Sequence, residues 1–202
     1  METKNKIKDA AEKLFFKYGI SSISVDDITH ELSISKKTFY ENFANKSELI
    51  NQIAMGFLIK IDKVLDDIEN QEDVIDKVIA LYTFLLELFK TCNATFIYDI
   101  KKYYPDIFIM FDEYKDNALK NLLIEFINKG KRDGVFVEDF ESDIIFSMHW
   151  KRFNNIIERE LLPQKKLFDP VFQKMIRSSL IGISTLKGHK IIDEKFNKLN
   201  KS

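Results

Sequence analysis

The stretch SISKKTFYENF, residues 33–43, concentrates cationic and hydroxyl side chains on a segment long enough for only about two helical turns. Ammonium and hydroxyl groups donate hydrogen bonds to phosphate oxygens and to the edges of nucleic-acid bases. Phe39 and Phe43 stand four residues apart, so they share one face of a helix and leave the polar residues on the other. The polar residues are Lys36, Lys37, Thr38, Tyr40 and Glu41.

Four capping patterns predict the elements that hold this stretch in place. A helix ends at Gly19, Ser24 and Asp27 form a capping box, Ser35 caps again, and Asn45 with Glu48 gives a further helix start. The pattern therefore predicts three short helices that lead into one long helix. Their expected ranges are 4–18, 24–32, 36–43 and 46–70.

Two short helices joined by a tight turn and braced by a third are typical of a helix-turn-helix, whose second helix enters the major groove of DNA. Lys36, Lys37 and Thr38 lie at the end of that helix that usually meets base edges. Tyr40 can donate to a phosphate, and Lys46 can bind a second phosphate together with the free N–H groups of the next helix. Ser24 can do the same at the start of its own helix.

Composition limits the remaining possibilities. The chain of 202 residues has a net charge of −1, so any binding to DNA must be local. We expect a cytoplasmic protein with no membrane partner, because the start lacks a signal-peptide pattern and the longest apolar run, 78–89, is too short to span a bilayer. The three histidines are far apart and no phosphate-binding loop is present, so we expect no catalytic residue, no metal and no cofactor.

Residues 7–54 resemble the DNA-binding domain of the TetR family of bacterial transcriptional regulators. The matching segments are AAEKLFFKYG, SVDDI, SISKKTFYENF and NKSEL. The resemblance implies an all-α fold with an N-terminal three-helix helix-turn-helix domain and a C-terminal helical domain for ligand binding and dimerisation. We expect the first domain over 1–46, a linking helix over 46–70 and the second domain over 47–202.

The resemblance also assigns contacts with double-stranded operator DNA. Phosphate contacts fall on Ser24, Tyr40 and Lys46, and groove contacts fall on Ser35, Lys36, Lys37 and Thr38. The chain departs from the family pattern at Ser33, Lys37, Glu41 and Asn42, so the operator cannot be inferred from a relative. Lys37 could contact a guanine or only a phosphate.

The rest of the chain is predicted to be helical. The expected ranges are 72–90, 94–103, 105–129, 142–160 and 168–187, with the third bent or divided and a frayed helix after Gly188. Most aromatic residues lie in this region, where stripes at helical spacing usually form core. In the family this region encloses a small-molecule pocket, which implies an apolar or aromatic inducer. The candidate pocket residues are Phe84, Phe89, Phe96, Tyr103, Phe108, Phe111, Phe146, His149, Trp150 and Phe153.

A single recognition helix reads only a few base pairs, so useful affinity requires two half-sites and a homodimer. The resemblance places the dimer interface on helices 142–160 and 168–187. The favoured function is a ligand-released repressor that binds a palindromic operator. The alternative is a DNA-bound regulator without an inducer whose C-terminal domain binds a partner protein, and activation in place of repression stays open.

Overall fold

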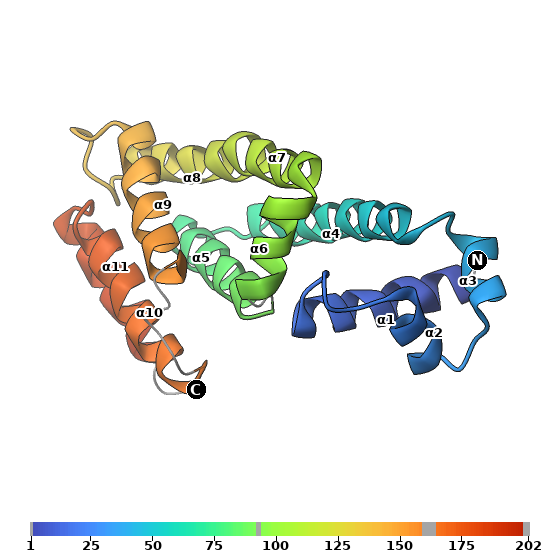
Figure 1. Ribbon diagram of the computed structural model, residues 1–202. Helices are drawn as coiled ribbons and strands as arrows, with labels where there is room; N and C mark the ends of the chain where they lie inside the picture. The colour runs from blue at the N-terminus through green and yellow to red at the C-terminus, as the bar shows by residue number, and fades with distance from the viewer. Residues whose placement is uncertain (1, 92–93, 159–164, 200–202) are drawn as a thin grey trace. The chain divides into compact units, whose positions relative to one another are not determined.

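The computed structural model describes residues 2–91, 94–158 and 165–199, with side chains placed over these ranges except at 86, 89–91, 94, 152–158, 165–172 and 199. All the regular elements in these residues are helical, and one isolated antiparallel bridge joins Phe136 to Ser184. The all-α prediction is confirmed (Figure 1). The elements are α1 (Glu2–Tyr18), α2 (Val25–Glu31), α3 (Lys36–Asn42), α4 (Lys46–Glu69), α5 (Val74–Thr91), α6 (Ala94–Tyr103), α7 (Pro105–Tyr114), η1 (Lys115–Leu119), α8 (Lys120–Arg132), α9 (Ser142–Glu158), α10 (Lys165–Ile181) and α11 (Leu186–Leu199).

The chain forms two compact units whose limits differ from the expected boundary at residue 46. The first unit comprises Met1–Asp66 with Glu87–Glu113, and the second comprises Asp67–Leu86 with Tyr114–Ser202. The chain therefore crosses between units within α4, within α5 and at the end of α7. The difference arises because buried side chains of α6 and α7 join the core of α1–α4.

The core of the first unit follows the apolar stripes of its helices. Each large side chain in it contributes about 1.5–3 kcal/mol by leaving water. This packing fixes the short helices α2 and α3, which are too short to be stable alone. Its most deeply buried members are Ile7, Ala11, Phe15, Ile20, Ile28, Phe39, Phe43 and Leu49.

The segment that was predicted as one bent or divided helix over 105–129 is divided. α7 starts at Pro105, a residue favoured in the first turn of a helix because its missing N–H would have no partner there. A π-helical turn, η1, then separates α7 from α8 while the backbone stays helical on both sides. The prediction of a divided helix is confirmed.

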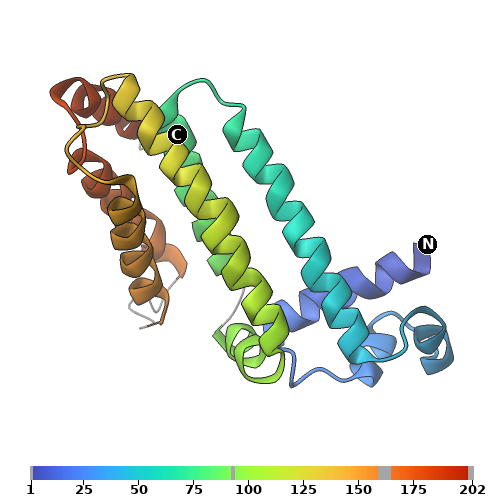
Figure 2. The ribbon, with the colours of Figure 1, turned by 90° about the horizontal axis from the view of Figure 1, so that it is seen from above.

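The helix after Gly188 was predicted to be frayed, and this prediction is wrong. α11 packs beside α10 (Figures 1 and 2), and it buries Ile192 and Phe196 completely or nearly so. Lys195 also lies 2.6 Å from Asp76 and 3.3 Å from Asp73 at the start of α5. The many charges of the tail concealed two apolar residues four apart, which is enough to anchor a helix on a core.

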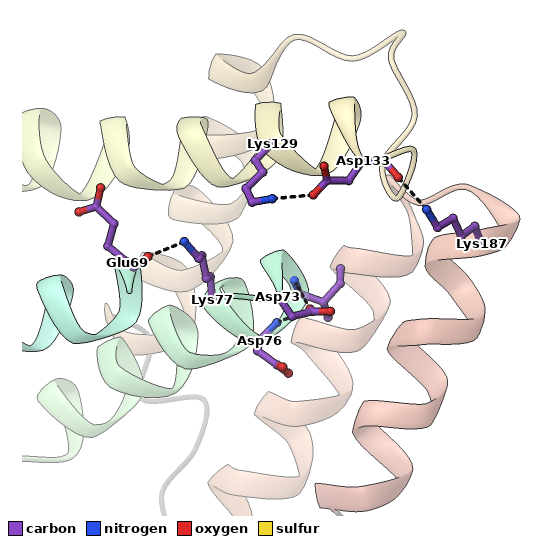
Figure 3. A network of polar contacts seen from close by, with 8 residues as sticks. Glu69, Asp73, Asp76, Lys77, Lys129, Asp133 and Lys187 are labelled. Atoms are coloured by element: carbon purple, nitrogen blue, oxygen red, sulfur yellow. Dashed lines mark hydrogen bonds and ion pairs between the residues drawn. The ribbon is translucent and has the colours of Figure 1, made fainter. Parts of the chain in front are cut away.

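The helix that was expected over 168–187 ends earlier in the structure, since α10 stops at Ile181. The hydroxyl of Thr185 accepts from the N–H of Gly188 at 3.2 Å and donates to the carbonyl of Gly134 at 2.8 Å. Lys187 donates to the carbonyl of Asp133 at 2.8 Å (Figure 3). These bonds tie the start of α11 to the turn after α8.

Figure 3 also shows how the chain turns from α4 into α5. The ammonium of Lys77 donates to the carbonyl of Glu69 at 2.5 Å, which satisfies a backbone group at the end of α4. At the start of α5, Asp73 accepts from the N–H groups of Ile75 and Asp76. The end of α4 and the start of α5 are thus capped by side chains.

Candidate nucleic-acid interface and cavity

The predicted capping box at the start of α2 is present. The N–H of Asp27 donates to the hydroxyl of Ser24 at 3.2 Å, and the N–H of Ser24 donates to the carboxylate of Asp27 at 2.7 Å. The bonds from Ser24 hold the pKa of Asp27 below its ordinary value. Ser24 is exposed at this helix start, where N–H groups favour an anion.

The turn between α2 and α3 contains a residue in the left-handed region. Ser33 has φ +52°, a conformation that glycine adopts more readily than other residues. Its N–H donates to His30, and the N–H of Ile34 donates to Thr29 across the turn. The tight turn therefore forms without glycine, at a conformational cost of about 1–2 kcal/mol.

α3 has the two faces that its sequence predicted. Phe39 and Phe43 are buried, whereas Lys37, Glu41 and Tyr40 are exposed, the last by 53%. Ser35 caps the helix by accepting from the N–H of Thr38 at 3.0 Å, and the two hydroxyl groups lie 2.9 Å apart. The cap and the two phenylalanines fix the polar face in one orientation.

Lys36 takes part in a contact between α2 and α3. Its ammonium lies 2.8 Å from the carboxylate of Asp26, and this contact raises the pKa of Lys36. Both side chains are more than 60% exposed. Water screens such an exposed pair, which contributes little to stability, so a phosphate or base can replace Asp26 at little cost.

Lys46 has a partner that sequence reasoning missed. Its ammonium donates to the carbonyl of Ile20 at 2.6 Å and lies 5.6 Å from the centre of the Phe15 ring. Burial lowers the pKa of Lys46, while the negative charges of Asp99 and Asp27 oppose that effect. An ammonium has three N–H donors, so the bond to Ile20 leaves donors for other acceptors.

The start of α4 is capped as the sequence predicted. The N–H of Glu48 donates to the side chain of Asn45 at 2.8 Å, and the N–H of Ala44 donates to Glu48 at 2.7 Å. All seven predicted DNA contacts consequently lie in the first unit, on α3 or at the N-terminal ends of α2, α3 and α4.

The structure separates the candidate pocket residues. Phe96 and Phe111 belong to the first unit, where their rings meet Phe16 and Phe57 edge-on. Tyr103 and Phe108 are exposed in the same unit, beside Lys102 and Lys101 respectively. The side chains of Phe89 and Phe153 lie outside the described residues. Phe96, Phe111, Tyr103 and Phe108 are therefore not brought to the cavity described next.

Phe146, His149 and Trp150 do meet, at a cavity inside the second unit. α5, η1, α8 and α9 all contribute to its walls, and Phe84 of α5 is half-buried without lining it. Sequence reasoning missed the remaining wall residues, four leucines and a tyrosine, because apolar residues at helical spacing carry no sign of a cavity. They are Leu81, Tyr82, Leu85, Leu119 and Leu123.

The cavity is almost entirely apolar and small. Its volume is about 20 Å³, close to the space that one water molecule needs. The rings of Phe146 and Trp150 stack with centres 5.9 Å apart, and the ammonium of Lys115 lies 5.7 Å from the Trp150 ring. The hydroxyl of Tyr82 and Nδ1 of His149 form a hydrogen bond, which is the polar feature of the wall.

The described ranges contain neither a metal-binding cluster nor a membrane-spanning helix. No group of three or more His, Cys, Asp or Glu side chains there is arranged to hold a metal ion. No helix in those ranges is both long enough and apolar enough to cross a membrane.

The comparisons with known proteins agree on one family. The family model described as bacterial regulatory proteins, tetR family, matches residues 7–53. An HTH-type transcriptional regulator of Staphylococcus aureus (strain bovine RF122 / ET3-1) is 29% identical over 128 residues, which cover 57% of this chain and 67% of that protein. The HTH-type transcriptional repressor KstR2 of Mycobacterium tuberculosis is 18% identical over 147 residues, covering 71% of this chain and 74% of that protein.

The fold has counterparts among solved structures. A transcriptional regulator from Saccharomonospora viridis, in complex with choline, superposes with a TM-score of 0.76 and 15% identity. The match covers 91% of this chain and 98% of that one. At this identity the likeness concerns the fold alone.

Proposed function

The chain belongs to the TetR family of bacterial transcriptional regulators, and on this premise we propose that it is a ligand-released repressor that binds a palindromic operator as a homodimer. Members of this family are regulators and not enzymes, in agreement with the prediction. Repression is favoured by the name of one relative, the repressor KstR2. We place its action in the cytoplasm, where bacterial DNA is found.

The observation that carries the proposal is the exposed polar face of α3. Phe39 and Phe43 hold this helix against the core, so its other face is free to enter a major groove. We assign phosphate contacts to Ser24, Tyr40 and Lys46. Groove contacts go to Ser35, Lys36, Lys37 and Thr38.

The test is a selection of duplexes from a randomised pool by the full-length protein, followed by gel shifts with the DNA that flanks its gene. We expect two inverted half-sites with centres about 34–36 Å apart, the distance between successive major grooves on one side of the duplex. A selection that enriches no sequence, together with binding that does not depend on sequence, would contradict the proposal.

Dimerisation is supported by apolar side chains that the second unit leaves exposed. Ile144 and Met148 stand four residues apart on α9 and are 53% and 61% exposed. Exposed apolar side chains on one helical face commonly mark an interface. A second copy of the chain would cover them.

The inducer is proposed to be a small apolar or aromatic molecule that enters the cavity beside Trp150. Ligand sites of drug-sized molecules usually measure about 300–1,000 Å³, so the present cavity must open before it can hold one. A shift of the Trp150 ring would create that space. The choline complex of the Saccharomonospora viridis regulator shows that this fold can hold a small molecule in another protein.

The small volume also favours the second candidate function. A regulator without an inducer would need no pocket, and its C-terminal region would bind a partner protein. A screen of aromatic compounds by Trp150 fluorescence separates the two candidates. The inducer proposal expects a compound that quenches Trp150 and releases the selected duplex, and compounds that quench Trp150 without releasing DNA would favour the partner-protein function.

A further inference from the structure

The peptide group between Ile20 and Ser21 is held from both sides by charged side chains. Its carbonyl accepts from the ammonium of Lys46 at 2.6 Å, and its N–H donates to Oδ2 of Asp99 at 2.7 Å. Lys46 is the first residue of α4 and Asp99 lies on α6. One loop peptide thus links two helices that are distant in sequence, and all the groups concerned belong to the first unit.

Asp99 is an unusual residue for this position because it is only 1% exposed. A buried carboxylate is costly unless hydrogen bonds and positive charge compensate it. The N–H of Ser21 supplies a hydrogen bond, and the ammonium of Lys46 supplies nearby positive charge. The buried carboxylate therefore has a specific set of partners in the loop and in α4.

The backbone next to this peptide is fitted closely to α6. Gly19 has φ +85°, and a Cβ atom there would lie 2.6 Å from Cγ2 of Thr95 and 3.1 Å from Oδ2 of Asp99. Both the conformation and the space require glycine. The loop and α6 consequently have little freedom to slide against one another.

The Ile20–Ser21 peptide lies close to two residues that can bind DNA phosphates. Ser24, three residues after Ser21, caps α2, and Lys46 starts α4. These two residues are proposed phosphate contacts at two separate helix ends. The Ile20–Ser21 peptide accepts a hydrogen bond from Lys46 directly and lies three residues before Ser24 in the chain.

We propose that Asp99 is a positioning residue for DNA binding, which acts through the Ile20–Ser21 peptide to set the distance between the phosphate contacts at Ser24 and Lys46. This inference rests on the proposed operator binding. Asp99 does not touch DNA in this arrangement. It fixes the loop, and the loop holds one donor of Lys46 while the others remain available for phosphate.

The experiment compares two replacements of Asp99 that keep the number and branching of its side-chain heavy atoms. Asp99→Asn retains an acceptor for the N–H of Ser21, whereas Asp99→Leu removes it. Asp106→Asn is the control, because it removes an exposed carboxylate of α7 from the same unit. Affinity for a duplex selected by the wild-type protein is measured at several salt concentrations, and the hydrogen exchange of the Ser21 amide is followed by NMR.

We expect Asp99→Leu to weaken duplex binding about tenfold or more, since the partly buried N–H of Ser21 loses its charged partner. The Ser21 amide should exchange faster in this variant. Asp99→Asn should recover most of the affinity, and the Asp106→Asn control should match the wild type. A lower salt slope in Asp99→Leu would show that a phosphate contact has been lost.

Full duplex affinity in a folded Asp99→Leu variant would overturn the inference, and so would equal losses in the Leu and Asn variants. If Asp99→Leu does not fold, Asp99→Ala, which also removes the acceptor for the N–H of Ser21, is combined with Lys46→Met. The two changes should then be non-additive for duplex affinity, because they act on one peptide group, and additive effects would refute the inference. Failure of the wild-type protein to select any duplex would instead contradict the proposed function, while the amide exchange still reports on the contact between Asp99 and Ser21.

Discussion

At the scale of single residues, two positions with left-handed backbone differ in what surrounds them. Ser33 lies in the exposed turn before α3 with φ +52°, whereas Gly19 packs against α6 with φ +85°. The first holds an exposed side chain in a strained backbone conformation, and the second excludes any side chain. The two glycine-favouring positions should therefore respond in opposite ways to substitution.

We predict that Ser33→Gly raises the free energy of unfolding by up to about 1 kcal/mol, because the relief of left-handed strain exceeds the entropy that glycine adds to the unfolded chain. Gly19→Ala should lower it by about 2 kcal/mol or more, through strain and the clash with Thr95. Urea denaturation followed by circular dichroism measures both. A stabilised Gly19→Ala variant would be incompatible with the close approach of α6.

The DNA contacts make a second prediction at this scale. Tyr40→Phe removes one hydroxyl from an exposed side chain and should weaken all duplexes to a similar extent, because phosphate contacts carry no sequence information. Lys37→Ala should change base preference by about 1–3 kcal/mol at one position if the lysine meets a guanine. Repeating the duplex selection with each variant tests this, and an unchanged motif with Lys37→Ala would make Lys37 a phosphate contact only.

At the scale of elements, α2 is only seven residues long and depends on its cap. The pKa of Asp27 is lowered in the folded protein by the hydroxyl and the N–H of Ser24. A lowered pKa means that the ionised carboxylate stabilises the folded state. The contribution is complete above the ordinary pKa near 3.8 and is lost as the pH falls through the lower value of the folded protein.

We therefore predict that the wild-type protein loses more stability than Asp27→Asn when the pH is lowered from about 5 to about 2, through the lowered pKa of Asp27. Thermal unfolding at each pH measures the difference. Asp106→Asn is a suitable comparison, because it removes an exposed acid from a different helix start. Parallel losses in wild type and Asp27→Asn would exclude a contribution from the capping box.

At the scale of the whole molecule, the proposed dimer depends on apolar residues of the second unit that stay exposed and can contact a second copy of the chain. Met148 and Ile144 are exposed on α9, whereas Ile183, within the range 168–187 that the resemblance assigned to the interface, is only 9% exposed and follows α10. Ile183→Lys would place a charge in the core and disturb folding. The side chains of α10 before residue 173 lie outside the described residues.

We predict that Met148→Lys converts the proposed dimer into a folded monomer and weakens DNA binding with it. Light scattering should give a mass near 23.8 kDa for this variant and twice that for the wild type. Ile59→Lys is the matched control, because Ile59 is also exposed but lies on α4 in the first unit. A wild-type protein that is monomeric at micromolar concentration would contradict the dimer.

The helix-turn-helix could be predicted from sequence because its signals are local. Ser24 and Asp27, Ser35 and Thr38, and Asn45 and Glu48 are each three residues apart, so neighbouring residues alone determine where α2, α3 and α4 begin. The two faces of α3 follow in the same way from the spacing of Phe39 and Phe43. The pattern of these residues was specific enough to identify the family.

Only the tertiary structure decided the contacts between distant segments. Asp99 meets Ser21 across 78 residues, and Tyr82 meets His149 across 67. α11 becomes a packed helix because Ile192 and Phe196 find a core, although its charges suggested fraying. The cavity likewise depends on which leucines of α5 and α8 face α9. Periodicity shows which residues share a helical face, but the packing of the folded chain determines what that face meets.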